Sequence, residues 1–178
     1  ITGSNGKSTV TSMVGAILEQ AGLDAPVCGN SGTALSEVVR AELNGEISPD
    51  AYVVEVSSFQ AHSIRDFHPR VAVILNIQPD HLDWHGTLDA YAKAKLRLVR
   101  NMDATNWLIY NSDDPKLTSY LPQHNVRLLP FMSEPSNPEA PAAWVGNGKV
   151  CWWTTGLEAT GMNVEELRVI GQHNHTNA

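Results

Sequence analysis

Gly3-Ser4-Asn5-Gly6-Lys7-Ser8 is a glycine-containing stretch that lies directly before a helical pattern. Glycines at positions 3 and 6 let the backbone curl so that its N–H groups point into one concavity, and the N-terminus of the following helix adds partial positive charge. Such an arrangement binds anions. Lys7 is placed to reach the β- and γ-phosphates of a nucleotide, and Ser8 to give its hydroxyl to Mg²⁺. The stretch therefore predicts an ATP-binding module of a phosphate-transferring enzyme.

The stretch departs from the general phosphate-loop pattern G-x-x-x-x-G-K-[ST]. Ile1 stands where the first glycine is expected, and Gly3 is displaced inward. A chance Gly-Lys-Ser at the start of a helix is the alternative interpretation. The remnant of a strand before the loop and the helix after it favour the phosphate loop.

Apolar periodicity around the loop predicts the fold class. The residues from Val10 to Leu18 follow an i, i+3, i+4, i+7 pattern, which predicts an amphipathic helix that ends near Gly22. Strands are expected at residues 26–28, 51–56, 71–76 and 107–111, helices at 34–43 and 87–102, and short strands at 143–145 and 150–154. This alternation predicts an α/β fold that contains a phosphate loop, with a mostly parallel twisted sheet flanked by helices and a small extra set of short strands near the C-terminal end.

Composition bounds the class of protein. The 178 residues suit one domain, and 42% hydrophobic with 17% charged residues indicates a globular chain. The net charge of −7 disfavours nucleic-acid binding, and no apolar run approaches the roughly 20 residues that cross a bilayer. Cys28 and Cys151 have no metal-type spacing and are expected to be unpaired thiols. Both ends of the sequence suggest a fragment of a longer protein.

Polar residues end two of the expected buried strands, where ligands bind in open α/β sheets. Glu55 ends the strand at 51–56, and a carboxylate there suits Mg²⁺, although an edge charge or a salt-bridge partner is the alternative. His81, Asp83 and His85 belong to a cluster of two His and two Asp residues after the strand at 71–76. Asp83 and His85 are the likelier structural members of this cluster, as caps of the following helix.

Lys95 lies on the inward stripe of the helix at 87–102, four residues after Tyr91 and four before Val99. Burial lowers the pKa of a lysine by up to ~3–5 units. A neutral amine is nucleophilic and takes up CO₂ as a carbamate, which is an anionic metal ligand. The alternative is a lysine whose amine passes the edge of the core to reach water.

Six segments together resemble the central domain of the Mur ligases, in that family's order and over essentially the whole chain. They are Ile-Thr-Gly-Ser-Asn-Gly-Lys-Ser-Thr, Glu-Val-Ser-Ser-Phe-Gln, Asn-x-x-Pro-Asp-His-Leu-Asp-x-His-Gly, Tyr-x-x-Ala-Lys, Asn-x-Asp-Asp and Gly-x-His-Asn-x-x-Asn-Ala. The family has the same shortened phosphate loop. Within it, the loop and Ser-Ser-Phe-Gln look most like the members that add D-glutamate to UDP-N-acetylmuramoyl-L-alanine.

The resemblance implies a role for each matching residue. The ATP phosphates would be held by the loop residues Gly3, Asn5, Gly6, Lys7, Ser8 and Thr9. Ser8 and Glu55 would bind a first Mg²⁺, and His81 with carbamylated Lys95 would bind a second. The muramoyl substrate would be contacted by Asn30, Ser57 and Gln60, and the adenine by Asn174 and Asn177, with His173 beside them. Lys7, His81 and Lys95 would be the catalytic residues.

The resemblance also implies a reaction and a setting. The cofactors would be ATP and Mg²⁺, and amide formation would proceed through an acyl phosphate in the bacterial cytoplasm, in a monomer with no nucleic-acid or membrane partner. A UDP-binding domain and an amino-acid-binding domain would lie outside residues 1–178, so the chain alone is expected to lack ligase activity and to bind ATP weakly. Alternatives are a sister Mur ligase, folylpolyglutamate synthase, a non-catalytic nucleotide-binding module, or a phosphate-loop NTPase switch.

Overall fold

The computed structural model describes residues 1–133, 141–154 and 157–166. Their helices are α1 (Lys7–Gln20), α2 (Leu35–Leu43), α3 (Ser58–His62), α4 (Leu82–His85), α5 (Leu88–Leu96) and α6 (Pro115–Thr118), with 3-10 turns η1 (Arg97–Val99) and η2 (Val164–Glu166). Their strands are β1 (Val27–Gly29), β2 (Val53–Glu55), β3 (Val71–Ile74), β4 (Trp107–Asn111), β5 (Arg127–Met132), β6 (Ala142–Gly146), β7 (Lys149–Thr154) and β8 (Leu157–Asn163).

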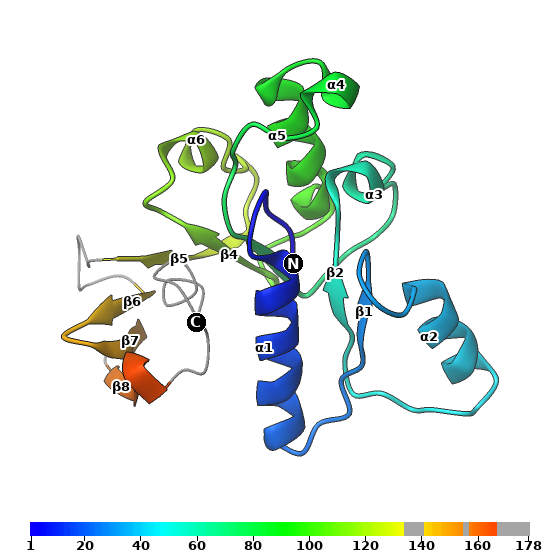
Figure 1. Ribbon diagram of the computed structural model, residues 1–178, viewed down its shortest axis with the longest axis horizontal. Coiled ribbons are helices and arrows are strands. Elements are labelled where there is room, and N and C mark those ends of the chain that lie inside the picture. Colours follow the sequence, from blue (N-terminus) through cyan, green and yellow to red (C-terminus); the bar gives the residue numbers. More distant parts are fainter. Residues whose placement is uncertain (134–140, 155–156, 167–178) are drawn as a thin grey trace.

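The strands form two sheets, and both are parallel near the phosphate loop. β1 pairs with β2, while β3, β4, β5 and β6 pair in that order, all in parallel. β7 and β8 then continue the larger sheet in antiparallel pairing. Figure 1 shows these C-terminal strands on the opposite side of the molecule from β1 and α2. The α/β prediction, with its mostly parallel sheet and extra short strands, is confirmed.

Two residues at the start of the chain link the two sheets. The backbone nitrogen of Ile1 donates to Val54 O at 2.8 Å, and Val56 N donates to Ile1 O at 2.8 Å. On the other side, Leu75 N donates to Thr2 O at 3.0 Å. Ile1 and Thr2 therefore lie between β2 and β3, and the phosphate loop leaves the sheet at its carboxyl edge, where parallel α/β folds bind ligands.

The helices and strands that the sequence predicts are present, and they differ from the prediction mainly in length. α1 begins at Lys7 and buries Val10, Thr11 and Gly15, whereas Ile17 of the predicted apolar stripe is 63% exposed. β3 ends at Ile74 rather than at residue 76, because the next residues turn to contact the phosphate loop. The helix predicted to reach residue 102 ends as the 3-10 turn η1.

A buried apolar cluster fixes the carboxyl edge of the larger sheet. Its members are Val56, Ala61, Ala72, Ile74, Ile77, Tyr91, Ala92, Leu98, Val99, Met102, Leu108, Leu117 and Val126. Helices α3 to α6 gather at the same end of the molecule as the loop that precedes α1 (Figure 1). None of the helices in the described part of the chain is long and apolar enough to span a membrane.

Candidate functional site

The phosphate loop presents the N-terminus of α1 without a side-chain cap. Gly6 is the N-cap residue and takes a left-handed conformation with φ of 83°, which glycine adopts without strain. The first N–H groups of a helix have no acceptor within the helix. No side chain caps them here, so they are available to an anion, as the sequence predicts. Ser8 and Thr9 lie in this first turn, with Ser8 exposed and Thr9 half-buried.

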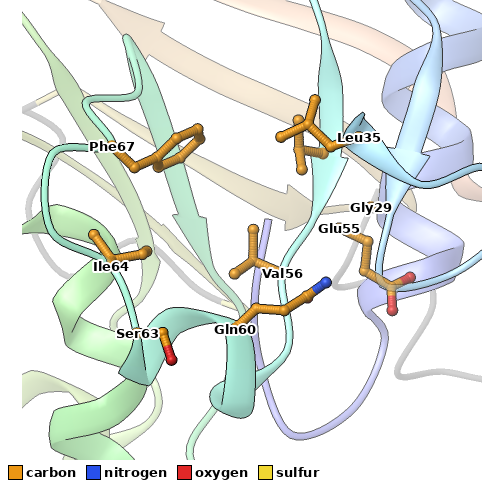
Figure 2. A pocket seen from close by; sticks show the side chains of 9 residues that line it. Gly29, Leu35, Glu55, Val56, Gln60, Ser63, Ile64 and Phe67 are labelled. Atoms are coloured by element: carbon orange, nitrogen blue, oxygen red, sulfur yellow. The ribbon is translucent and has the colours of Figure 1, made fainter. Parts of the chain in front are cut away.

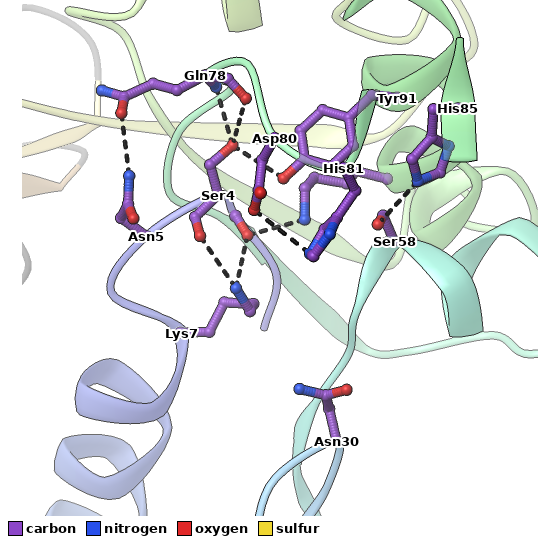
Figure 3. A network of polar contacts seen from close by, with 12 residues as sticks. Ser4, Asn5, Lys7, Asn30, Ser58, Gln78, Asp80, His81, His85 and Tyr91 are labelled. Carbon is purple, nitrogen blue, oxygen red and sulfur yellow. Dashed lines mark hydrogen bonds and ion pairs between the residues drawn. The ribbon is translucent and has the colours of Figure 1, made fainter. Parts of the chain in front are cut away.

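The residues after β3 hold the loop in place. Figure 3 shows Ser4 at the centre of this network. Its Oγ donates to Gln78 O at 3.0 Å, accepts from Gln78 N at 2.8 Å and lies 2.9 Å from the Tyr91 hydroxyl. Asn5 and Asn76 exchange two hydrogen bonds: Asn5 N donates to Asn76 Oδ1 at 2.9 Å, and Asn76 Nδ2 donates to Asn5 O at 3.1 Å. The loop is therefore fixed by side chains outside the loop itself.

Lys7 and Lys95 approach the same backbone carbonyl. Lys7 Nζ donates to Gly3 O at 3.0 Å and to Ser4 O at 3.1 Å. Lys95 Nζ donates to Gly3 O at 2.8 Å. In this conformation Lys7 lies over its own loop, so binding of a phosphate at the helix N-terminus would exchange loop carbonyls for phosphate oxygens.

The amine of Lys95 is buried. Its side chain is 1% exposed and lies 4.7 Å from the centre of the Tyr91 ring. Burial, reinforced by the charge of Lys7, lowers the pKa of Lys95 from 10.5 to about 7, although Asp80 and Glu55 act in the opposite direction. A substantial fraction of the amine is thus neutral near pH 7. The alternative in which Lys95 extends to water is wrong, because the core surrounds the whole side chain.

Glu55 is a buried carboxylate with only one of its two oxygens hydrogen-bonded within the described residues. It is 3% exposed, and Oε1 accepts from Asn30 Nδ2 at 2.8 Å. Oε2 is buried and has no hydrogen-bond partner within the described residues, where Glu55 also forms no ion pair. The alternative that Glu55 is an exposed charge at the edge of the sheet is therefore wrong. A buried, unpaired carboxylate oxygen is costly unless a cation approaches it, and a hard cation such as Mg²⁺ fits this oxygen.

His81 lies in the loop between β3 and α4, close to the phosphate loop. It adopts a left-handed backbone conformation with φ of 50°, and its Nε2 is 3.5 Å from Asp80 Oδ2. Its side chain is 48% exposed. Figure 3 shows His81 and Asp80 between Ser4 and His85. A half-exposed imidazole at this place is accessible to a ligand.

The prediction that His85 or Asp83 caps the following helix is wrong. Thr87 is the N-cap of α5 and accepts from Ala90 N at 3.1 Å. His85 lies within α4 and hydrogen-bonds Ser58 through Nε2 at 3.0 Å, so it joins α4 to α3. Burial, together with neighbouring His62 and His81, lowers the pKa of His85, which favours the neutral ring.

Ser57 and Gln60 form a capping box at the start of α3. Gln60 N donates to Ser57 Oγ at 3.3 Å, and Ser57 N donates to Gln60 Oε1 at 2.9 Å. This arrangement satisfies two backbone donors and explains why the chain turns into α3 directly after β2. Both residues are thus at the carboxyl edge of the sheet, where they also have a structural role.

A pocket opens between β2 and α3, with a volume of about 280 Å³. It is lined by Gly29, Leu35, Val54, Glu55, Val56, Gln60, Ser63, Ile64 and Phe67. Figure 2 shows the Gln60 side chain extending toward Glu55 across this pocket. The pocket brings together Gln60, one of the residues predicted to contact substrate, and Glu55, one of the predicted metal ligands.

The structure brings some of the predicted site residues together and leaves others outside the description. Lys7, Lys95 and Gly3 meet directly, and Asn30 contacts Glu55. Asn174, Asn177 and His173 lie outside the described residues. Residues 1–133, 141–154 and 157–166 contain no group of three or more His, Cys, Asp and Glu side chains that could hold a metal ion. A Mg²⁺ ion here would take further oxygens from phosphates and water, which is its usual behaviour.

Asn76, Gln78 and Asp114 contribute to the site although no role for them is predicted from the sequence. The first two hydrogen-bond the phosphate loop, and Asp114 Oδ2 accepts from Ile77 N at 2.7 Å. The available signal was their position: Asn76 and Asp114 fall in quoted family segments, and each follows a buried strand.

The whole chain is similar to known proteins. The model of the Mur ligase middle domain family matches residues 1–178. The chain is 36% identical to a UDP-N-acetylmuramoylalanine–D-glutamate ligase of Polaromonas sp. (strain JS666), covering 100% of this chain and 34% of that protein. It is 38% identical to the enzyme of the same description from Streptococcus uberis, covering 100% of this chain and 37% of that protein. The chain therefore spans a little over a third of the length of these relatives.

Solved structures share the fold at lower sequence identity. A MurF ligase from Thermotoga maritima in complex with ADP superimposes with a TM-score of 0.62 at 21% identity, over 85% of this chain and 36% of that chain. Escherichia coli FolC in complex with DHPP and ADP superimposes with a TM-score of 0.65 at 17% identity, over 99% of this chain and 50% of that chain. The match of the family model to every residue, with close relatives across the full chain, shows that this chain belongs to the Mur ligase middle domain family.

Proposed function

We propose that this chain is the ATP-binding central domain of a ligase that adds D-glutamate to UDP-N-acetylmuramoyl-L-alanine in the synthesis of peptidoglycan precursors. The observation that carries the proposal is the buried amine of Lys95, 2.8 Å from the carbonyl oxygen of Gly3 in the phosphate loop. A nucleotide-binding switch has little use for a buried lysine at this place. The names of the relatives support D-glutamate as the amino acid.

In this proposal the phosphate loop holds the triphosphate of ATP. The loop residues Gly3, Asn5 and Gly6 and the N–H groups of the first turn of α1 would surround the phosphate oxygens, and Ser8 and Thr9 would add hydroxyl contacts. Lys7 would leave the carbonyls of Gly3 and Ser4 for the phosphates. Asn174 and Asn177 are proposed to contact the adenine.

Mg²⁺ would be held by Ser8 and by the unpaired oxygen of Glu55, and a second ion by His81 and carbamylated Lys95. The ions would neutralise charge on the phosphates during transfer. Carbamylation requires the neutral amine: Lys95 Nζ bonds to the carbon of CO₂, and one proton leaves to water. Burial of Lys95 favours this neutral form.

The proposed reaction has two steps that balance. The alanyl carboxylate of the substrate attacks the γ-phosphorus of ATP, so that ADP leaves and an acyl phosphate forms. The amino group of D-glutamate then attacks the acyl carbon, the tetrahedral intermediate expels inorganic phosphate, and the amide loses one proton. Asn30, Ser57 and Gln60 would orient the muramoyl substrate for the first step, in which Lys7 offsets the charge that gathers on the transferred group.

We further propose that a UDP-binding domain and an amino-acid-binding domain complete the enzyme. The chain covers 34% of the Polaromonas ligase, which leaves room for both. The complete enzyme is proposed to act as a monomer in the bacterial cytoplasm, with no nucleic-acid or membrane partner.

The test is a ligase assay of the longer protein that carries this chain. UDP-N-acetylmuramoyl-L-alanine and ATP are supplied with D-glutamate, L-alanine or meso-diaminopimelate in turn, and the amide product and ADP are measured. Product with D-glutamate alone is expected. No product with D-glutamate would contradict the proposed activity. Amide formation by residues 1–178 alone would contradict the need for further domains.

A further inference from the structure

The segment Asn76–Gln78 holds the phosphate loop through both backbone and side-chain groups. Ser4 N donates to Asn76 O at 3.1 Å, in addition to the paired hydrogen bonds between Asn5 and Asn76. Asn5 Nδ2 donates to Gln78 Oε1 at 3.0 Å, and Gln78 also contacts Ser4 through its backbone. The segment begins two residues after the end of β3 and belongs to no helix or strand. Its position must therefore be fixed by other contacts.

Asp114 supplies one such contact from a distant part of the chain. Its Oδ2 accepts from the backbone N–H of Ile77 at 2.7 Å, across 37 residues of sequence. Its Oδ1 accepts from Lys116 N at 2.9 Å and from Leu117 N at 3.0 Å, which caps α6. One carboxylate thus joins the first turn of α6 to the middle of the segment that grips the phosphate loop.

A cap alone would need only one of these oxygens, which serine or threonine also provides. Ile77 is 3% exposed, and a buried backbone N–H requires an acceptor. The hydrogen bond that Asp114 accepts from it is charge-assisted and short, so it is stronger than a bond between neutral groups. The α6 end of this link is also rigid, because Leu117 is completely buried in the core.

We propose that Asp114 is a positioning residue for the phosphate loop, acting through Ile77 on the residues that contact Ser4 and Asn5. Within the described part of the chain, the Asp114 side chain hydrogen-bonds Ile77, Lys116 and Leu117 and no residue of the phosphate loop. The hydrogen bond to Asp114 Oδ2 fixes the position of the Asn76–Gln78 segment, and the hydrogen bonds from that segment fix the position of the phosphate loop. The role concerns the loop before any nucleotide binds, so it can be tested apart from the proposed function.

The test compares two neighbouring serine substitutions in residues 1–178 by amide hydrogen exchange, without nucleotide. Asp114→Ser keeps a cap for α6 but is too short to reach Ile77. It is expected to speed exchange at Ile77, and at Ser4 and Asn5 by roughly tenfold, the size expected when one charge-assisted hydrogen bond is lost. Asp113→Ser is the matched control, since Asp113 accepts from Ser133 N instead.

The remaining amides separate positioning from general loss of stability. Exchange at Leu108 in β4, whose amide makes no contact with Asp114, is expected to be the same in the wild-type chain and both variants. Faster exchange at Ile77 alone, or equal effects of the two variants on Ser4 and Asn5, would overturn the proposal. If Asp114→Ser does not fold, Asp114→Asn takes its place, because its single acceptor oxygen cannot serve both α6 and Ile77.

Discussion

Lys7 and Lys95 donate to the same oxygen, the backbone carbonyl of Gly3, at 3.0 and 2.8 Å. Two ammonium groups at one acceptor repel each other, and the charge of Lys7 is one reason why the pKa of Lys95 is lowered. The phosphate loop thus holds one cation that can move to a phosphate and one buried amine that gives up its proton near neutral pH. This pairing ties the nucleotide site to the chemistry proposed for Lys95.

The first prediction concerns the carbamate on Lys95. Lys95→Ala in the longer ligase is expected to lower kcat by about 10²–10³-fold, as when a group that stabilises transition-state charge is removed. A short-chain carboxylic acid such as acetate would then enter the vacated space and restore part of the activity. Steady-state rates with increasing acetate measure this. Lys93→Ala is the control, since Lys93 is exposed and pairs with Asp89. Full activity of Lys95→Ala without acetate would contradict the role.

The second prediction is a pH dependence of stability. The pKa of Lys95 is about 7 in the folded chain and ordinary, near 10.5, when unfolded. Between these values the unfolded state binds more protons, so the contribution of Lys95 to stability rises with pH across this window and is least favourable below pH 7. Lys95→Met is therefore expected to be more stable than the wild type at pH 6, by on the order of 2 kcal/mol, and to lose this advantage toward pH 10.

Urea unfolding of residues 1–178 at pH 6, 8 and 9.5 measures the difference. Lys93→Met serves as the reference. The hydrogen bond to Asp89 raises the pKa of Lys93, so the charged Lys93 side chain stabilises the folded chain at all three pH values, whereas the charged Lys95 side chain destabilises it. A constant difference between Lys95→Met and the wild type at all three pH values would show that Lys95 stays charged in the folded chain.

The third prediction concerns the unpaired oxygen of Glu55. Glu55→Gln replaces that anionic oxygen with an amide and should weaken Mg²⁺ binding at least about tenfold. The substitution removes a buried charge, so the variant should unfold no more readily than the wild type. The Mg²⁺ concentration for half-maximal activity and the melting temperature without metal are the two measurements. Glu46→Gln, an exposed glutamate that accepts from Asn44, is the control. An unchanged Mg²⁺ requirement would exclude Glu55 as a ligand.

Much of the fold could be predicted from apolar runs in the sequence. The elements that could not be predicted have physical reasons for it. β2, β3 and β4 lie within near-continuous apolar stretches of the sequence, and such stretches predict buried parallel strands. β5 was missed because Pro130 interrupts its pattern, yet Pro130 pairs with Tyr110 in the parallel ladder. The short helices α3 and α6 were missed because four or five residues carry no periodicity; their signals are the caps Ser57 and Asp114.

The candidate site could be predicted in its residue types but not in its contacts. The inward position of Lys95 followed from helical spacing, and its burial is confirmed. The spacing could not show that its amine meets the carbonyl of Gly3, because that contact depends on how α5 crosses the loop. His85 was assigned to the wrong partner for the same reason: its contact with Ser58 joins elements 27 residues apart.

The last prediction concerns Gly29, which lies against the backbone of Glu55 in the neighbouring strand. Gly29 has φ of 118°, a conformation that L side chains rarely adopt, and a Cβ atom there would overlap the carbonyl oxygen of Glu55. Gly29→Ala should therefore push β1 from β2 and destabilise the chain by about 2–4 kcal/mol. The same shift would separate Asn30 from Glu55 Oε1. Gly32→Ala is the control, because it has a similar left-handed φ of 73° but open space around it. Urea unfolding of both variants measures the difference, and equal losses of stability would show that backbone strain alone, rather than the overlap with Glu55, requires glycine at position 29.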